Sequence, residues 1–134
     1  MIRSIKQAIA ETLNYSGRSK RSDYWYYLVF MLLSIVIIST IVLFLGLNPE
    51  DPLFTQVSFF TGTLLIIPNI ALTVRRAHDF GVTGWIAVPI FVIGFIGTYQ
   101  ETFGILDWAG LALSTVVGLM PGHKGPNKYG AAPA

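Results

Sequence analysis

The sequence predicts an all-α integral membrane protein with four transmembrane helices, preceded by a short interfacial amphipathic helix. Two observations predict this class. Of the 134 residues, 53% are hydrophobic and only 12% are charged, which is about half the charged fraction of an average soluble domain. The charge-free apolar runs are also long enough to cross a hydrocarbon core of about 30 Å. The apolar content excludes a disordered chain, and the lack of cysteine excludes a disulfide framework.

The predicted helix at the start of the chain covers residues 1–14. Its apolar side chains recur at helical spacing and form one stripe, while Arg3 and Lys6 lie on other faces; the stripe consists of Ile2, Ile5, Ile9 and Leu13. This pattern is typical of a helix lying in the headgroup region of a membrane. A frayed terminus with a helical bias is the alternative interpretation.

The four predicted spans follow from segments that are almost free of charge. The first two, about residues 25–47 and 53–74, contain no charged residue. Charge-free apolar runs of this length are typical of membrane-spanning helices and not of the core helices of soluble proteins. The third and fourth, about 84–100 and 103–120, are shorter and richer in glycine and proline. We expect residues 1–134 to form a single membrane domain.

The distribution of charge predicts the topology. Short-looped membrane proteins accumulate Lys and Arg on the cytoplasmic side. With four spans, all nine basic residues fall on one side and four acidic residues on the other; these acids are Glu50, Asp51, Glu101 and Asp107. Both termini are therefore predicted to be cytoplasmic. A re-entrant hairpin over residues 84–121 is the alternative, although it would carry Glu101 to membrane depth, where a carboxylate is costly.

Three polar segments lie at the cytoplasmic ends of the predicted spans. They read Gly-Arg-x-x-Arg-x-x-Tyr-Trp at 17–25, Arg-Arg-x-x-Asp-x-Gly-x-x-Gly-Trp at 75–85, and Gly-x-x-Gly-x-Asn-x-Tyr-Gly at 122–130. In this order they resemble the DUF805 family, small bacterial inner-membrane proteins of unknown function. The resemblance covers nearly the whole chain except the first dozen residues. It implies a bacterial plasma membrane and no particular activity.

The arginines of these segments are the candidate binding residues. Arg18 and Arg21 are three residues apart and would share a face on a helix, while Asp79 can pair with Arg75 or Arg76. The planar guanidinium group of arginine can donate two parallel hydrogen bonds to a phosphate. We therefore predict that these arginines form a cluster that binds anionic phospholipid headgroups or a protein partner, with Arg18, Arg21, Arg75 and Arg76 as the donors. Asp79 would be a structural ion pair within it. There are three alternative interpretations of these charges. They could form a purely structural Arg–Asp network, form a transport or gating site, or serve only to orient the protein in the membrane.

Other residues are predicted to hold the helices together. Gly110, Ser114 and Gly118 form a small-xxx-small stripe that allows close approach of another backbone. The aromatic residues 24–27 are expected at the headgroup level. The amide of Asn69 is expected to bond to a neighbouring helix, with a ligand role as the alternative.

No catalytic constellation stands out. His78 lies beside Asp79, but the chain has two histidines, no cysteine and no zinc-binding spacing, so we expect no metal and no cofactor. We expect a non-enzymatic membrane component that contacts anionic phospholipids and a membrane-protein partner or further copies of itself, and no nucleic acid. A small oligomeric channel or transporter is the alternative, and an enzyme acting on lipid-linked substrates is a third class.

Overall fold

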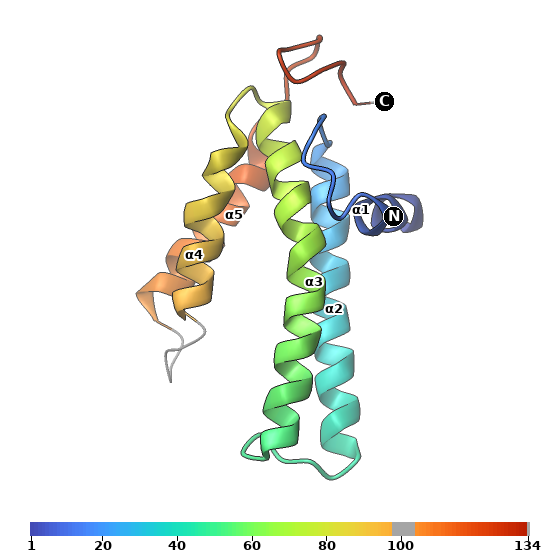
Figure 1. Ribbon diagram of the computed structural model, residues 1–134, viewed down its shortest axis with the longest axis vertical. Coiled ribbons are helices and arrows are strands. Elements are labelled where there is room, and N and C mark those ends of the chain that lie inside the picture. Colours follow the sequence, from blue (N-terminus) through green and yellow to red (C-terminus); the bar gives the residue numbers. More distant parts are fainter. Residues whose placement is uncertain (98–103, 134) are drawn as a thin grey trace.

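The computed structural model describes residues 1–97 and 104–133, and these residues form helices, turns and a short irregular tail. The helices are α1 (Ile2–Ala10), α2 (Arg21–Phe44), α3 (Pro52–Asp79), the 3₁₀ turn η1 (Gly84–Ile86), α4 (Ala87–Gly97) and α5 (Ile105–Leu119). Figure 1 shows α2 and α3 side by side as a long hairpin, with α4 and α5 as a shorter pair that leans away from it. The helical class predicted from the sequence is confirmed.

The helices differ in the thickness of membrane that they can cross. At 1.5 Å per residue, the 24 residues of α2 and 28 residues of α3 extend about 36 Å and about 42 Å, which exceeds a hydrocarbon core of about 30 Å. By length and composition, both can span a membrane. Residues 84–97 and α5 are shorter apolar helices, so a count of four crossings stays a prediction.

The helix boundaries differ from the predicted spans at the charged ends. α2 begins at Arg21 rather than at 25, and α3 continues to Asp79 rather than ending at 74. The predicted spans stopped where charge began, whereas the helical backbone continues through these charged residues. On α3 they are paired within the protein: Arg75 with Glu11, and Arg76 with Asp79. α1 ends at Ala10, short of the expected residue 14.

The long helices expose apolar side chains along most of their length. Within the most apolar stretch of α2 only 11% of the residues are buried, and Leu32, Leu33 and Ile37 are each more than half exposed. Soluble proteins rarely expose apolar surface over such an area. The exposure therefore fits a helix whose surroundings are lipid.

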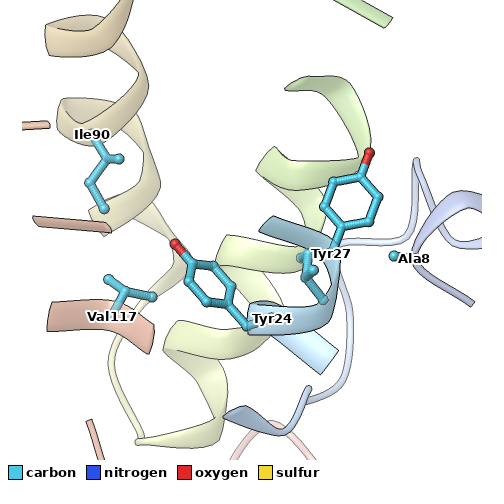
Figure 2. Close-up of a cluster of buried hydrophobic side chains, with 6 residues drawn as sticks. Ala8, Tyr24, Tyr27, Ile90 and Val117 are labelled. Carbon is cyan, nitrogen blue, oxygen red and sulfur yellow. The ribbon is translucent and has the colours of Figure 1, made fainter. Parts of the chain in front are cut away.

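The core lies where α2 passes the other helices, and two tyrosines fill it. Tyr24 and Tyr27 are fully buried. Figure 2 shows Tyr24 pointing toward Ile90 of α4 and Val117 of α5, while Tyr27 lies on the side of Ala8 of α1. The expectation that these two rings anchor the protein at the headgroups is therefore wrong.

Both tyrosines can be buried because each hydroxyl finds a carbonyl oxygen. The Tyr27 hydroxyl donates to the carbonyl of Leu65 at 2.8 Å, next to the Leu64 carbonyl that loses its helical N–H donor at Pro68. The Tyr24 hydroxyl donates to the carbonyl of Ser114 on α5 at 3.3 Å. The two side chains thus connect α2 to α3 and to α5.

The small residues of α5 lie against other helices of the same chain. Gly118 packs under the indole of Trp25, where a Cβ atom would collide with the ring, and the indole N–H donates to the Gly118 carbonyl at 3.2 Å. Gly110 is buried and lies against Ile93 and Gly94 of α4. The stripe therefore packs α5 onto α2 and α4.

Candidate functional site

The three polar segments meet at one end of the helices, which we call the motif end. Residues 17–25 lead into and open α2, residues 75–85 close α3, and residues 122–130 form the tail after α5. In Figure 1 the tail lies beside the end of α3, opposite the turn between α2 and α3. We call that opposite turn, residues 45–51, the hairpin end.

Asp79 is the centre of the motif end. Its Oδ1 accepts hydrogen bonds from Nε and Nη2 of Arg18, at 3.0 and 2.9 Å, and its Oδ2 accepts one from Nη1 of Arg76. All three side chains are buried, with exposed fractions of 6% for Asp79, 1% for Arg18 and 0% for Arg76. Buried charges are tolerated when they are paired and hydrogen-bonded. We call these three residues the Arg–Asp network.

Carbonyl groups of the tail accept hydrogen bonds from several of the remaining N–H groups of the network, while the buried Nε of Arg76 has no partner among the described residues. Arg18 donates at 2.6 Å to the carbonyl of His123 and, through Nη1, to two further tail carbonyls, those of Gly125 and Gly130. Arg76 donates to the carbonyl of Met120, and the backbone N–H of His123 donates to the carbonyl of Asp79 at 2.9 Å. Two guanidinium groups face a single carboxylate, so one positive charge is left without a counter-charge. The dipoles of the backbone carbonyl groups stabilise it.

Glycines permit this close packing. A Cβ atom on Gly122 would overlap the Asp79 carboxylate. Gly81, just beyond α3, has a φ of +83°, a conformation that favours glycine. Gly81 and Gly122 therefore have a steric explanation, whereas a Cβ atom on Gly125 would meet nothing within 4 Å.

Arg75 faces another way and connects α3 to α1. Its Nη1 donates to the carbonyls of Glu11 and Asn14, at 2.8 and 2.7 Å, and pairs with the Glu11 carboxylate at 3.1 Å. Its Nε donates to Ser19 Oγ at 3.3 Å. Of the two partners suggested for Asp79, Arg76 makes the contact, and Arg75 does not.

Arg21 is the one predicted donor that is exposed. It is the first residue of α2, and Arg18 lies before the helix, so the expectation that the two share a helix face is wrong. Arg21 borders a hollow of about 450 Å³ whose cationic rim includes Lys20 and Lys124; the floor and remaining wall consist of Ser22, Asp79, Gly122, His123, Ala132 and Pro133. We call this the basic hollow.

Sequence reasoning did not single out Lys20 and Lys124. Both lysines are exposed at the rim of the basic hollow, although they are 104 positions apart along the chain. The available signal was their position inside two of the three motifs. Their proximity depends on the tail folding back over α3.

His78 is more tightly held than its position in the sequence suggests. Nδ1 lies 3.1 Å from the carbonyl oxygen of Gly17, and the ring stacks on Tyr129 with centroids 3.8 Å apart. Asn127 donates to the His78 carbonyl at 2.8 Å. One residue of the middle motif therefore contacts both of the other motifs.

Asn69 lies in the interior of the packed helices. The residue is 6% exposed, and its Oδ1 has no hydrogen-bond partner within residues 1–97 and 104–133. In this chain Asn69 does not border the basic hollow or the larger groove described below.

Apolar helices exposed along their length, with charge confined mainly to one end, define a small helical membrane protein. Comparison with known proteins specifies the family. The model for "Protein of unknown function (DUF805)" matches residues 12–131, and the chain belongs to this family. It is a small bacterial membrane protein.

Two relatives from Escherichia coli (strain K12) cover most of the chain. Inner membrane protein YhaI is 32% identical over 121 residues, covering 90% of this chain and 86% of that protein. The uncharacterized protein YiiR is 27% identical over 128 residues, covering 87% and 84%. No solved structure matches the chain.

Proposed function

We propose that this protein is a non-enzymatic membrane component that binds phosphate-bearing lipid headgroups in the basic hollow. The observation that carries the proposal is the contrast between buried and exposed cations. Arg18 and Arg76 are committed to Asp79 and to carbonyls, and Arg75 to α1. Arg21, Lys20 and Lys124 instead surround a hollow with exposed side chains.

The electrostatics of the hollow suit a phosphate group. Asp79 is at its floor, but this carboxylate is already paired with two guanidinium groups. The exposed rim therefore carries excess positive charge. A cation near an anionic membrane surface contributes about 1 kcal/mol to binding, and arginine adds two parallel hydrogen bonds to phosphate.

We further propose that the motif end faces the cytoplasm, with α1 at the membrane surface. All nine Lys and Arg residues lie in α1 or in the segments that form the motif end, whereas Glu50 and Asp51 lie at the hairpin end. The positive-inside bias supports this orientation. Because the chain has no cysteine, single cysteines can be introduced and labelled with a thiol reagent that does not cross the membrane. Cysteines in place of Lys20 and Lys124 should be labelled only after permeabilisation, and a cysteine in place of Glu50 should be labelled from outside. External labelling at Lys124 would contradict the orientation.

Headgroup binding is tested by removing two rim charges. The protein is placed in nanodiscs of phosphatidic acid and phosphatidylcholine, and retained lipids are counted by native mass spectrometry. Arg21→Gln with Lys124→Gln should weaken retention of phosphatidic acid by about 30-fold, which corresponds to about 2 kcal/mol. The matched control, Arg3→Gln with Lys6→Gln, removes the same amount of charge from exposed positions of α1. This control should retain phosphatidic acid as the wild type does.

Equal retention in the two double variants would overturn the headgroup proposal. Retention lost in both would point to net charge rather than to a site, and would also contradict it. If cross-linking in cells at Lys124 captures a protein in place of lipid, the hollow is a protein-binding surface instead. Ion flux in liposomes would favour the channel or transporter alternative, whereas the proposed component conducts nothing.

A further inference from the structure

A groove of about 1430 Å³ separates α3 from α4. α4 leans away from α3 and lies with α5 (Figure 1). The volume is above the roughly 300–1,000 Å³ of pockets for drug-sized ligands. The groove is therefore large enough for a long, extended molecule.

The two walls of the groove are apolar and run along the helices. On α3 the lining residues include Ile66, Ile70 and Val74, which recur every four residues and so share one face. On α4 they include Val88 and Phe91. Because α3 is long enough to span the membrane, the stripe follows the direction of lipid acyl chains.

The motif end of the groove is polar, and His78 continues the α3 stripe there, four residues after Val74. A carbonyl oxygen can only accept a hydrogen bond, so the contact with Gly17 places the proton of the neutral ring on Nδ1. Nε2 is then an acceptor. It makes no hydrogen bond with the described residues. It packs close to Gly84, where an added Cβ atom would lie 3.2 Å from Nε2, and both His78 and Gly84 line the groove.

The ring is held in this orientation before any ligand arrives. The Gly17 carbonyl fixes one edge, and the parallel Tyr129 ring covers one face with planes 9° apart. An oriented acceptor at the end of an apolar groove fits a lipid that carries a hydrogen-bond donor near its headgroup.

Charge selects among such lipids. Lys128 Nζ lies 4.9 Å from the centre of the Tyr129 ring that stacks on His78. The residues that line the described groove include no Asp or Glu. These surroundings favour an anionic headgroup over the ammonium of phosphatidylethanolamine.

We propose that the α3–α4 groove binds one molecule of phosphatidylglycerol from the bilayer. Its acyl chains lie along the apolar stripes, and a hydroxyl of its glycerol headgroup donates a hydrogen bond to His78 Nε2. Phosphatidic acid has the negative charge but lacks this glycerol. The groove is a different surface from the basic hollow, so the proposal does not rest on headgroup binding there.

His78→Asn tests the hydrogen bond. The asparagine amide can still donate to the Gly17 carbonyl, but it has no acceptor at the position of Nε2. In nanodiscs containing phosphatidylglycerol, phosphatidic acid and phosphatidylethanolamine, native mass spectrometry should show one phosphatidylglycerol held by the wild type. Its preference over phosphatidic acid should fall by about fivefold in the variant, the value of one hydrogen bond.

Gly62→Leu tests the groove. Gly62 lines it, and a Cβ atom there would meet nothing within 4 Å. Leucine is also a better helix former than glycine, so the variant should fold with its groove filled and should lose phosphatidylglycerol. Thr40→Leu, on an exposed position of α2 outside the groove, should keep it.

The two lipid proposals fail separately. Arg21→Gln with Lys124→Gln should lose phosphatidic acid and keep phosphatidylglycerol, and Gly62→Leu should show the reverse. Unchanged phosphatidylglycerol in Gly62→Leu, or an unchanged preference in His78→Asn, would overturn the groove proposal. A wild-type dimer that carries no lipid and dissociates in Gly62→Leu would assign the groove to a second copy and overturn it as well.

Discussion

The motif end and the long helices α2 and α3 are stabilised in different ways. At the motif end, buried charged groups and backbone carbonyls from three distant segments bond to one another. Along α2, apolar side chains are mostly exposed. The stability of the motif end therefore depends on the identity of the residue at each position. The stability of α2 depends on its residues being apolar. Four sets of variants test this difference.

The largest effect is expected for Asp79→Asn. The substitution keeps the shape of the side chain but leaves two buried guanidinium groups without a counter-charge. Breaking a buried pair costs about 3–5 kcal/mol, which should appear as a lower free energy of unfolding in detergent micelles. Asp51→Asn at the hairpin end is the control and should cost less than about 1 kcal/mol. Equal losses would remove the distinction between the two ends.

Gly122→Ala should have the next largest effect. Its Cβ atom would overlap the Asp79 carboxylate, and forcing extra atoms into a packed site costs about 1–3 kcal/mol. The tail offers a matched control in Gly125, where a Cβ atom has open space. Thermal unfolding should separate the two alanine variants by several degrees. A Gly125→Ala variant as unstable as Gly122→Ala would contradict the packing described here.

Arg75→Met should release α1 without dismantling the Arg–Asp network. It removes two hydrogen bonds to carbonyls and the ion pair with Glu11, with an expected cost of about 1–3 kcal/mol. Hydrogen exchange should accelerate in residues 2–13 and stay slow near Asp79. Glu11→Gln should be milder because that carboxylate is 34% exposed. Fast exchange at both places would mean that the two sets of contacts form one cooperative unit.

The smallest effect is expected on the surface of α2. Leu33 is 54% exposed, and Leu33→Val keeps it apolar. The free energy of unfolding should change by less than about 0.5 kcal/mol. A loss comparable to that of Gly122→Ala would show that α2 packs specifically against something on this face.

The sequence was sufficient for features that depend on composition and order. Long charge-free runs predict apolar helices, and the three motifs identify the residues of the motif end. The motif resemblance also placed the chain in its family. Each of these features is local, so no knowledge of the fold was needed.

Pairing across the fold was not predictable in the same way. Arg18 and Asp79 are 61 residues apart, and the tail carbonyls that Arg18 contacts have no side-chain signature. Tyr24 and Tyr27 looked like headgroup anchors because aromatic residues beside charges have the same pattern whether they face lipid or the core. Only the positions of α1, α4 and α5 decide between these environments.

The central claim is that Arg18 and Asp79 hold the three motifs together, and a double-mutant cycle tests it most directly. Free energies of unfolding are measured for Arg18→Met, Asp79→Asn and the double variant, with Arg18→Met and Asp51→Asn as the control pair. Directly contacting residues typically show coupling of about 0.5–3 kcal/mol. We predict coupling above about 1 kcal/mol for Arg18 with Asp79 and additive effects for the control. Additivity within about 0.5 kcal/mol for Arg18 and Asp79 would contradict the account.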